Sequence, residues 1–371
     1  MTKKNLLFSI FILMFILPLG MKTWPLTAAE GLKSFSIKTN TISPGPFGVP
    51  SGEAFTLAVS GQNNSKAAHI NFSGYTQLRF RSRPDGSDGF DIRRSRLTLR
   101  GRIAGPFDYK LQGEFGGSSG FKLLDAAISF RIHPAVDLTV GQQKIPFSLE
   151  NTASSARLDT INRSQPVEAL AARSRDVLGN HSGRDIGATV NGSLGNGPDT
   201  MRFEYAVGIF NGAGINSSDD NDSKDLAGRV RAILFPGFSA GASFYSGRRT
   251  PIGDPEKSFD RSRWGLELSW KYGIFDLKGE YLHGRDEPVN RNGWYAQIGA
   301  FAVKDKLQVV AKIDSFDPNT ATDRNRRNIA TLGVNWFISR AAILQVNYEI
   351  RSEEGDAVDN NLFIAQFQIR Y

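Results

Sequence analysis

From residue 70 to the end of the chain, apolar and polar side chains alternate in one short segment after another. Sixteen segments of 9 to 14 residues show this period of two: residues 70–80, 90–103, 107–116, 121–132, 136–144, 183–194, 200–210, 224–235, 237–247, 261–272, 274–283, 292–303, 305–316, 327–338, 341–351 and 361–371. Such alternation is weak in one segment, but its repetition is typical of a transmembrane barrel. It predicts an all-β fold, an antiparallel transmembrane β-barrel of 16 strands over residues 70–371.

The connections between these segments alternate in length. Those after odd-numbered segments are mostly long and polar, as at 211–223, 248–260, 317–326 and 352–360. Those after even-numbered segments are tight, as at 133–135, 236, 273, 304 and 339–340. Transmembrane barrels have long external loops and short periplasmic turns. A soluble β-sandwich would show the same alternation of apolar and polar side chains within strands. That fold, however, gives no reason for long and short connections to alternate along the chain.

The two faces of the segments differ in polarity. Leu97 and Leu99 have one parity, and the neighbouring arginines Arg96 and Arg100 have the other. Because lipid cannot solvate charge, we expect the apolar parity to face lipid and the charged parity to line a wet lumen. Four tryptophans share the outward parity and would form two interfacial girdles: Trp264, Trp270, Trp294 and Trp336.

One long stretch, residues 145–182, interrupts the series of segments. It has no sustained period of two and contains Pro146 and Pro166. A long unpatterned segment within a compact domain is usually either a mistaken assignment of elements or a functional loop, and we interpret this one as functional. We expect it to be the third external loop, folded into the barrel as a constriction loop.

The chain begins with the pattern of an export signal. Lys3 and Lys4 precede an apolar run that ends near Leu19, and small residues at Thr27 and Ala29 fit a cleavage site. We therefore expect a signal peptide at residues 1–29 and a location in an outer membrane of the Gram-negative type. Residues 30–69 would then be a mostly irregular periplasmic tail, in which residues 55–59 could form one short strand.

Few residues suggest chemistry on a substrate. The chain has no Cys and 4 His, and no metal-binding pair, nucleophile motif or phosphate cradle before a helix is present. The prediction is a protein that is not an enzyme, with no catalytic residues, no metal and no cofactor. The formal net charge of +8 comes without a Lys/Arg-rich block, so a nucleic-acid partner is not expected.

Basic side chains form the most informative set. On the lumen parity and in the long loop, the candidate anion-binding, pore-lining residues are Arg79, Arg81, Arg94, Arg96, Arg100, Arg102, Arg131, Lys144, Arg157, Arg163, Arg229 and Arg231, with Arg173 and Arg175 nearby in the loop. Basic residues lining a pore attract anions, and guanidinium matches phosphate oxygens. Alternatively, these charges pair with lumen carboxylates: Asp108, Glu114, Asp125, Asp137, Glu204 and Glu267.

The chain also resembles a known family from about Tyr75 to Tyr371. The stretches that carry the resemblance are Ile92-Arg93-Arg94-Ser95-Arg96-Leu97, Phe107-Asp108-Tyr109-Lys110-Leu111, residues 138–150, Ser154-Ser155-Ala156-Arg157, Arg184-Asp185-Ile186-Gly187, Phe316-Asp317-Pro318-Asn319, Leu332-Gly333-Val334-Asn335-Trp336 and Asn361-Leu362-Phe363. Together they are similar to the phosphate-selective porin O and P family. The resemblance implies a 16-stranded trimeric porin whose third external loop folds inward.

These observations predict an outer-membrane porin for passive diffusion of small anions, with phosphate as the leading candidate. The expected partners are small anions, outer-membrane lipid and two further copies in a homotrimer. Three alternatives stay open. They are a general diffusion porin whose lumen charges cancel, a structural barrel with a plugged lumen, and an outer-membrane enzyme such as a lipase.

Overall fold

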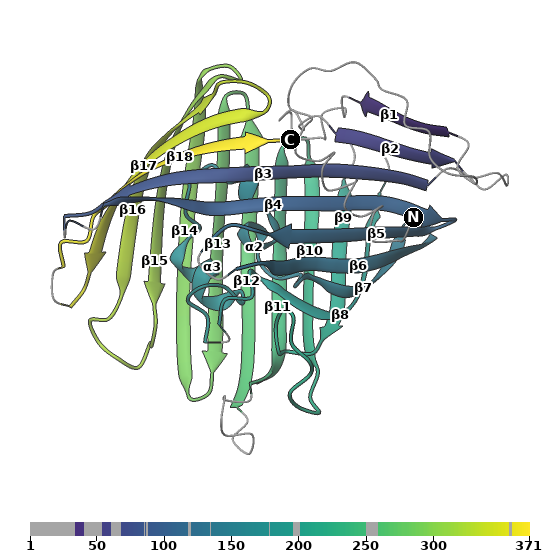
Figure 1. The fold of residues 1–371 in the computed structure, drawn as a ribbon. Coiled ribbons are helices and arrows are strands. Elements are labelled where there is room, and N and C mark those ends of the chain that lie inside the picture. The colour runs from purple at the N-terminus through teal and green to yellow at the C-terminus, as the bar shows by residue number, and fades with distance from the viewer. Residues whose placement is uncertain are drawn as a thin grey trace.

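The computed structural model describes residues 34–40, 54–60, 68–84, 86, 88–117, 120–133, 135–177, 179–195, 201–249, 259–355 and 358–371. The expected signal peptide at residues 1–29 lies outside these ranges. Within them, 16 antiparallel strands form a closed barrel (Figure 1). They are β3 (Ala68–Ser82), β4 (Gly89–Ala104), β5 (Phe107–Glu114), β6 (Lys122–His133), β7 (Val136–Lys144), β8 (Arg184–Leu194), β9 (Arg202–Phe210), β10 (Asp225–Phe235), β11 (Phe238–Arg249), β12 (Phe259–Tyr272), β13 (Phe275–Asp286), β14 (Val289–Val303), β15 (Leu307–Asp317), β16 (Arg327–Phe337), β17 (Ala342–Glu353) and β18 (Leu362–Arg370). The predicted fold class and strand number are confirmed, and every strand end lies within three residues of its expected position.

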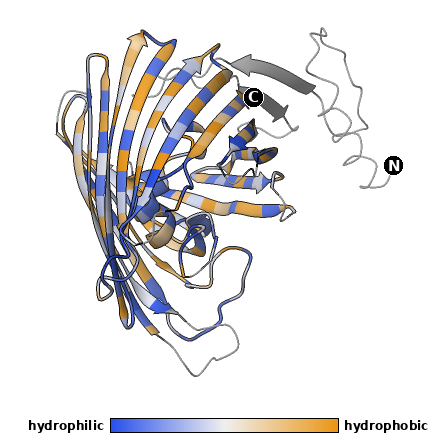
Figure 2. Cartoon of the chain, turned by 90° about the vertical axis from the view of Figure 1, so that its left-hand side faces the viewer, coloured by the Kyte–Doolittle hydropathy of each residue, from blue (hydrophilic) through white to orange (hydrophobic). Residues whose placement is uncertain are grey.

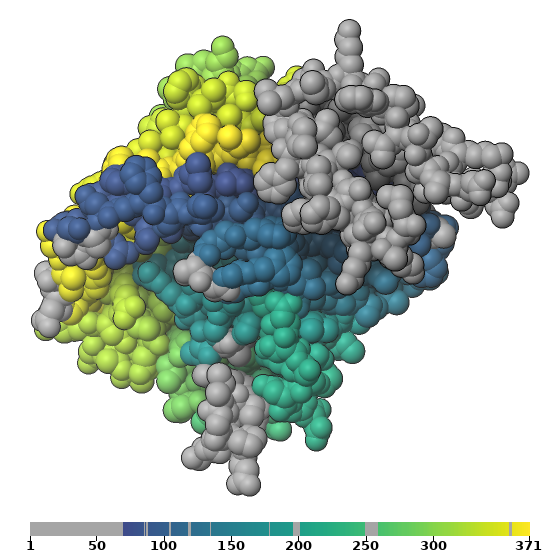
Figure 3. All heavy atoms as spheres, viewed as in Figure 1, coloured from purple at the N-terminus to yellow at the C-terminus, as the bar shows by residue number. Residues whose placement is uncertain are grey.

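The last strand closes the barrel on the first. β18 pairs antiparallel with β3 from Phe363 opposite Ser82 to Arg370 opposite Tyr75. In the space-filling view the yellow C-terminal strand lies directly along the blue β3 (Figure 3). Gly74 and Tyr371 complete the seam by exchanging backbone hydrogen bonds of 2.5 and 3.1 Å. Closure leaves no unpaired edge along the shared length of these strands.

The segment before the barrel adds two strands. β1 (Ser34–Asn40) pairs with β2 (Ala54–Ser60), and β2 continues onto β3 from Phe55 opposite Phe72 to Val59 opposite Ala68. β2 therefore covers the part of β3 that lies beyond the end of β18. The strand expected at residues 55–59 corresponds to β2, whereas β1 was not expected in a mostly irregular tail.

The barrel has its polar groups inside and its apolar groups outside. Leu266 and Leu332 are 55% and 59% exposed on the outer face, while Gln308 and Gln368 are almost completely buried. Hydrophobic and hydrophilic residues alternate along the strands (Figure 2). All four outward tryptophans are more than one-third exposed. This distribution is the reverse of a water-soluble core and fits a surrounding of lipid. None of the helices in the described ranges is long and apolar enough to cross a membrane.

A β-bulge interrupts β4. Gln77 of β3 pairs with Arg94, but the next residue, Leu78, pairs with Ile92, so Arg93 has no partner of its own. The bulge reverses the parity: before it Ile92 faces outward, and after it Leu97 does. The uninterrupted alternation expected over residues 90–103 is wrong at this point.

Candidate functional site

The loop between β7 and β8 contains three short helical turns. They are α2 (Leu149–Thr152), the 3₁₀ turn η1 (Ser155–Arg157) and α3 (Gln165–Leu170). Helices this short are unstable alone, so their ends need outside partners. The Ser148 hydroxyl accepts the Asn151 N–H at 3.2 Å and caps the start of α2. At the other end, Lys144 Nζ donates to three consecutive carbonyls, those of Asn151, Thr152 and Ala153, at 2.7–3.0 Å.

The middle of the loop lies along the inner wall of the barrel. Four wall amides donate to its backbone carbonyls: Gln77 to Ser155 (3.3 Å), Gln368 to Ala156 (3.2 Å), Gln345 to Leu158 (3.1 Å) and Asn335 to Asp159 (2.8 Å). These amides come from β3, β18, β17 and β16, which are successive neighbours around the barrel. The loop therefore crosses the strands from one to the next. Figures 1 and 2 place its helices within the curved wall.

The same amides also bond to one another. Together with Gln308 and Gln366 they form an amide belt, with side-chain contacts Gln77–Gln368 (2.7 Å), Gln366–Gln345 (3.0 Å), Gln345–Asn335 (3.1 Å) and Asn335–Gln308 (2.9 Å). Amide side chains carry a donor and an acceptor and do not titrate, so the charge of the amide belt that binds the loop does not change with pH.

Carboxylates of the wall bind the first residues of the loop helices α2 and α3. Glu280 on β13 accepts the N–H groups of Leu149 and Glu150 at 2.8 and 2.7 Å. Asp314 on β15 accepts the N–H of Gln165 at 3.2 Å. These are unpaired helix-start donors, which favour a negative partner.

A third wall carboxylate binds the loop through a side chain. Glu349 on β17 accepts the side-chain amide of Asn162 at 2.6 Å. Together, Glu280, Asp314 and Glu349 are at most 4% exposed. The loop thus covers carboxylates on three different strands.

Most of the expected pore-lining arginines are ion-paired. The pairs are Arg79 and Arg81 with Asp91 (2.8 and 3.0 Å), Arg96 with Glu114 (2.6 Å), Arg102 with Asp108 (2.9 Å), Arg131 with Asp137 (3.0 Å), Arg229 with Glu267 (2.5 Å) and Arg231 with Glu204 (3.3 Å). The alternative of mutual pairing therefore holds for seven of the twelve candidates. Their fields are largely cancelled at a distance by the neighbouring carboxylates.

The other five candidates have different surroundings. Lys144 and Arg163 are occupied by the loop itself; Arg163 donates to the carbonyls of Glu150 and Ala153, both at 3.0 Å. Arg94 donates to the Gln77 side chain at 3.0 Å. Arg100 and Arg157 are exposed. For Arg94, Arg100 and Arg157, no ion pair with any described carboxylate is present.

The candidates omitted several lumen cations, among them Arg93, Arg184 and Lys278. The bulge turns Arg93 inward, where it donates to Asn162 at 2.7 Å. The sequence signal was the change of apolar parity between Ile92 and Leu97. Arg184, the first residue of β8, is buried and pairs with Asp125 at 2.8 Å.

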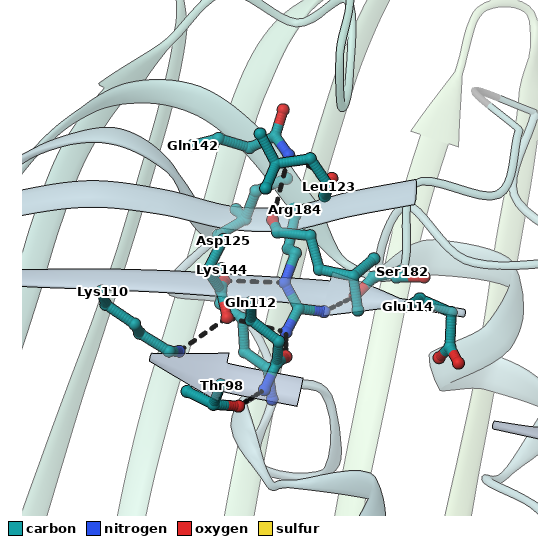
Figure 4. A network of polar contacts seen from close by, with 12 residues as sticks. Thr98, Lys110, Gln112, Glu114, Leu123, Asp125, Gln142, Lys144, Ser182 and Arg184 are labelled. Atoms are coloured by element: carbon teal, nitrogen blue, oxygen red, sulfur yellow. Dashed lines mark hydrogen bonds and ion pairs between the residues drawn. The ribbon is translucent and has the colours of Figure 1, made fainter. Parts of the chain in front are cut away.

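Arg184 belongs to a network that crosses several strands. Asp125 on β6 also pairs with Lys110 on β5 at 2.6 Å, and Arg184 donates to Gln112 at 3.0 Å. Figure 4 shows these side chains pointing toward one another from neighbouring strands. Asp125, a further lumen carboxylate considered from the sequence, is therefore paired as well.

Comparison with known proteins identifies this architecture. The family model for phosphate-selective porin O and P matches residues 67–371. The chain belongs to this family. A comparison with curated proteins found no match in sequence. The strand count, the closed barrel and the loop between β7 and β8 are thus features of a porin that forms an outer-membrane channel.

Solved porin structures share the fold at low sequence identity. An anion-selective porin from Comamonas acidovorans has a TM-score of 0.59 and 17% identity, covering 82% of this chain and 99% of that one. The trimer form of the Vibrio cholerae outer-membrane protein OmpT has a TM-score of 0.60 and 12% identity, covering 82% and 100%. The outer-membrane channel DcaP of Acinetobacter baumannii has a TM-score of 0.55 and 13% identity, covering 82% and 97%.

Proposed function

We propose that this outer-membrane porin admits small anions in preference to cations. The observation that carries the proposal is the set of lumen arginines without a described carboxylate partner, Arg94, Arg100 and Arg157. Cations that line a water-filled pore raise the local concentration of anions and lower that of cations. Because most other lumen arginines are paired, the expected preference is moderate.

Inorganic phosphate is the leading candidate solute. A guanidinium group can bind two phosphate oxygens at once, which a chloride ion cannot exploit. The name of the family points to the same solute. The structural neighbour from Comamonas acidovorans is itself an anion-selective porin. Phosphate in the bath should then reduce chloride current by occupying the arginines.

The loop at residues 145–182 would set the narrowest part of the channel. Its middle is fastened to the amide belt, and Arg157 is exposed at its 3₁₀ turn. An arginine at a constriction acts on every passing ion, since ions cannot avoid it there. Arg157 is therefore the candidate with the largest expected effect on selectivity.

The test is the reversal potential of single channels in a planar bilayer under a KCl gradient. Wild type should prefer chloride, and Arg157→Gln and Arg94→Gln should each reduce the preference about twofold to threefold, as loss of one lumen charge implies. The matched control is the double variant Arg229→Gln/Glu267→Gln, which removes a complete ion pair and should leave the reversal potential unchanged. A wild-type reversal potential near zero, with no block by phosphate, would contradict the proposal.

A second candidate is a general diffusion porin. The observation that favours it is the pairing of seven candidate arginines with lumen carboxylates. In that case neutral solutes, chloride and potassium would pass at rates set by size alone. The same reversal-potential measurement separates the two candidates.

We also propose the surroundings in which the channel works. The apolar outer face would contact outer-membrane lipid, and residues 1–29 and 30–69 would serve as signal peptide and periplasmic tail.

A homotrimer is proposed from the family resemblance and from the trimer form of the OmpT neighbour. Small outward residues such as Gly101 and Ala126 permit close packing of barrels. Chemical cross-linking in detergent should give a ladder that ends at three copies, and one that ends at a single copy would contradict the trimer.

A further inference from the structure

We propose that the loop between β7 and β8 makes the pore anion-preferring by masking carboxylates of the lumen wall. This inference rests on the proposed anion preference and explains its origin. It assigns positioning roles to the amide belt and a charge-masking role to the loop. Selectivity then depends on which charges face water as well as on the number of arginines.

Three carboxylates of the lumen wall lie beneath the loop. Glu280, Asp314 and Glu349 come from β13, β15 and β17, and all three side chains accept hydrogen bonds from loop groups. Two of them also have a cation of the wall nearby: Arg351 pairs with Glu349 at 2.6 Å, and Lys312 lies 3.9 Å from Asp314. Their exposed fractions are 4%, 1% and 3%. A carboxylate screened by hydrogen-bond donors at this depth contributes little attraction to a passing cation.

Two of the loop's own carboxylates bind cations of the wall, and a third binds within the loop. Asp159 binds Lys278 and Gln297 of the wall, and Asp176 pairs with Arg263 at 3.0 Å. Glu150 accepts the N–H and hydroxyl of Ser164, both at 2.9 Å.

The loop's cations are arranged differently. Arg157 and Arg175 are exposed, whereas Glu150 and the Asp176 side chain are buried. Arg163 and Arg173 are buried as well, and Asp159 and Glu168 are half-buried, so the exposed charges of the described loop residues are the two arginines.

Lumen carboxylates elsewhere offer a comparison within the same molecule. Asp108 on β5 and Glu204 on β9 have side chains that are 37% and 36% exposed. Their ion-pair partners are wall arginines. Asp108 and Glu204 are thus ion-paired but partly open to water, whereas the three carboxylates beneath the loop are closed to it.

The fastening of the loop can be weakened without changing any charge. Asn335 and Gln345 belong to the amide belt, and they donate to the loop carbonyls of Asp159 and Leu158. The double variant Asn335→Leu/Gln345→Leu removes these bonds and leaves every ionisable group in place. Gln366→Leu is the matched control, because the Gln366 side chain donates to Gln345 of the neighbouring strand rather than to the loop.

The first experiment labels carboxylates of the folded porin with a water-soluble carbodiimide and glycinamide and locates the label by mass spectrometry. In wild type and Gln366→Leu, Asp108 and Glu204 should be labelled and Glu280, Asp314 and Glu349 protected. In the double variant Asn335→Leu/Gln345→Leu, Glu280, Asp314 and Glu349 should be labelled as strongly as Asp108. Equal labelling of all five carboxylates in wild type would overturn the proposal. Retained heat-modifiable migration on gels shows that each variant is folded.

The second experiment measures reversal potential for the same proteins. Release of the loop should lower the chloride-to-potassium permeability ratio about threefold, the factor for a change of about half a kT per unit charge in lumen potential, because that change acts on both ions with opposite sign. Adding Glu280→Gln, Asp314→Asn and Glu349→Gln to the released variant should restore the ratio. An unchanged ratio despite new labelling would overturn the masking role.

The two proposals fail in different ways. If the wild-type channel is unselective, the proposed anion preference is wrong. Masking would still be supported if the released variant then turned cation-preferring. If wild type is anion-preferring and the released variant is equally so, the preference comes from the arginines alone and masking is wrong.

Discussion

Whether a lumen guanidinium can attract a solute anion depends on its nearest neighbours. Arg229 is neutralised by Glu267 at 2.5 Å, whereas Arg157 is exposed with no described carboxylate beside it. Arg163 and Lys144 have a third role, because they bind backbone carbonyls and hold the loop in shape. The same residue type on one lumen surface thus serves as paired wall charge, free charge or structural clamp.

A titration prediction belongs to this scale. Burial alone would raise the pKa of Glu168 in α3, but Arg173, the Ser174 hydroxyl and Arg163 outweigh it and lower the pKa to about 2 from the ordinary 4.5. The ionised Glu168 carboxylate therefore stabilises the folded loop at pH values above about 4.5, the pKa of this group in the unfolded chain. This contribution is lost as the pH falls from about 4.5 to about 2.

Thermal unfolding in detergent checks this prediction. Wild type should unfold at a higher temperature than Glu168→Gln at pH 7, and the difference should shrink as the pH is lowered from about 4.5 to about 2. Gln keeps the shape of the side chain and removes the charge, so it isolates the electrostatic contribution. A difference that stayed constant over this range would contradict the assigned pKa.

At the scale of elements, two local features shape the barrel: the bulge in β4 and the seam between β3 and β18. The bulge brings Arg93 to the lumen beside Arg94. The seam needs glycine at position 74, because an added Cβ would lie 2.3 Å from the Tyr371 ring and 2.6 Å from the backbone oxygen of Arg96. The ring of the last residue fills the space that a side chain would otherwise occupy.

Closure of the barrel should therefore be sensitive to Gly74→Ala. The methyl group meets backbone as well as the ring, so relief requires movement of the strands at a cost on the order of 1–3 kcal/mol. Gly89→Ala is the control, since nothing lies within 4 Å of its added Cβ. On unheated gels the folded form of Gly74→Ala should be lost at a lower temperature than wild type, and Gly89→Ala should match wild type. Equal behaviour of both variants would show that the seam tolerates the change.

At the scale of the whole molecule, an even number of strands separates two kinds of connection onto two sides of the membrane. The long connection between β15 and β16 includes Asn319, and the tight turn between β12 and β13 includes Gly273. We expect the long connections to lie at the cell exterior, because outer-membrane barrels have long external loops and short periplasmic turns.

Surface labelling of intact cells tests this topology. An epitope inserted after Asn319 should bind antibody on intact cells, and an epitope inserted after Gly273 should bind only after the outer membrane is opened. Each insertion lies between strands, so both proteins should still show heat-modifiable migration. Binding at Gly273 on intact cells would contradict the orientation.

The sequence by itself determined the strand positions, the faces and the long loop, because lipid and water impose opposite demands on alternate side chains of every strand. Only the tertiary structure decided which lumen charges are free, since pairs such as Arg229 with Glu267 join strands that are not consecutive in the chain. It alone placed the loop on the amide belt and over Glu280, Asp314 and Glu349. Local patterns record which medium a side chain faces, whereas charge pairing and masking depend on distances across the closed barrel.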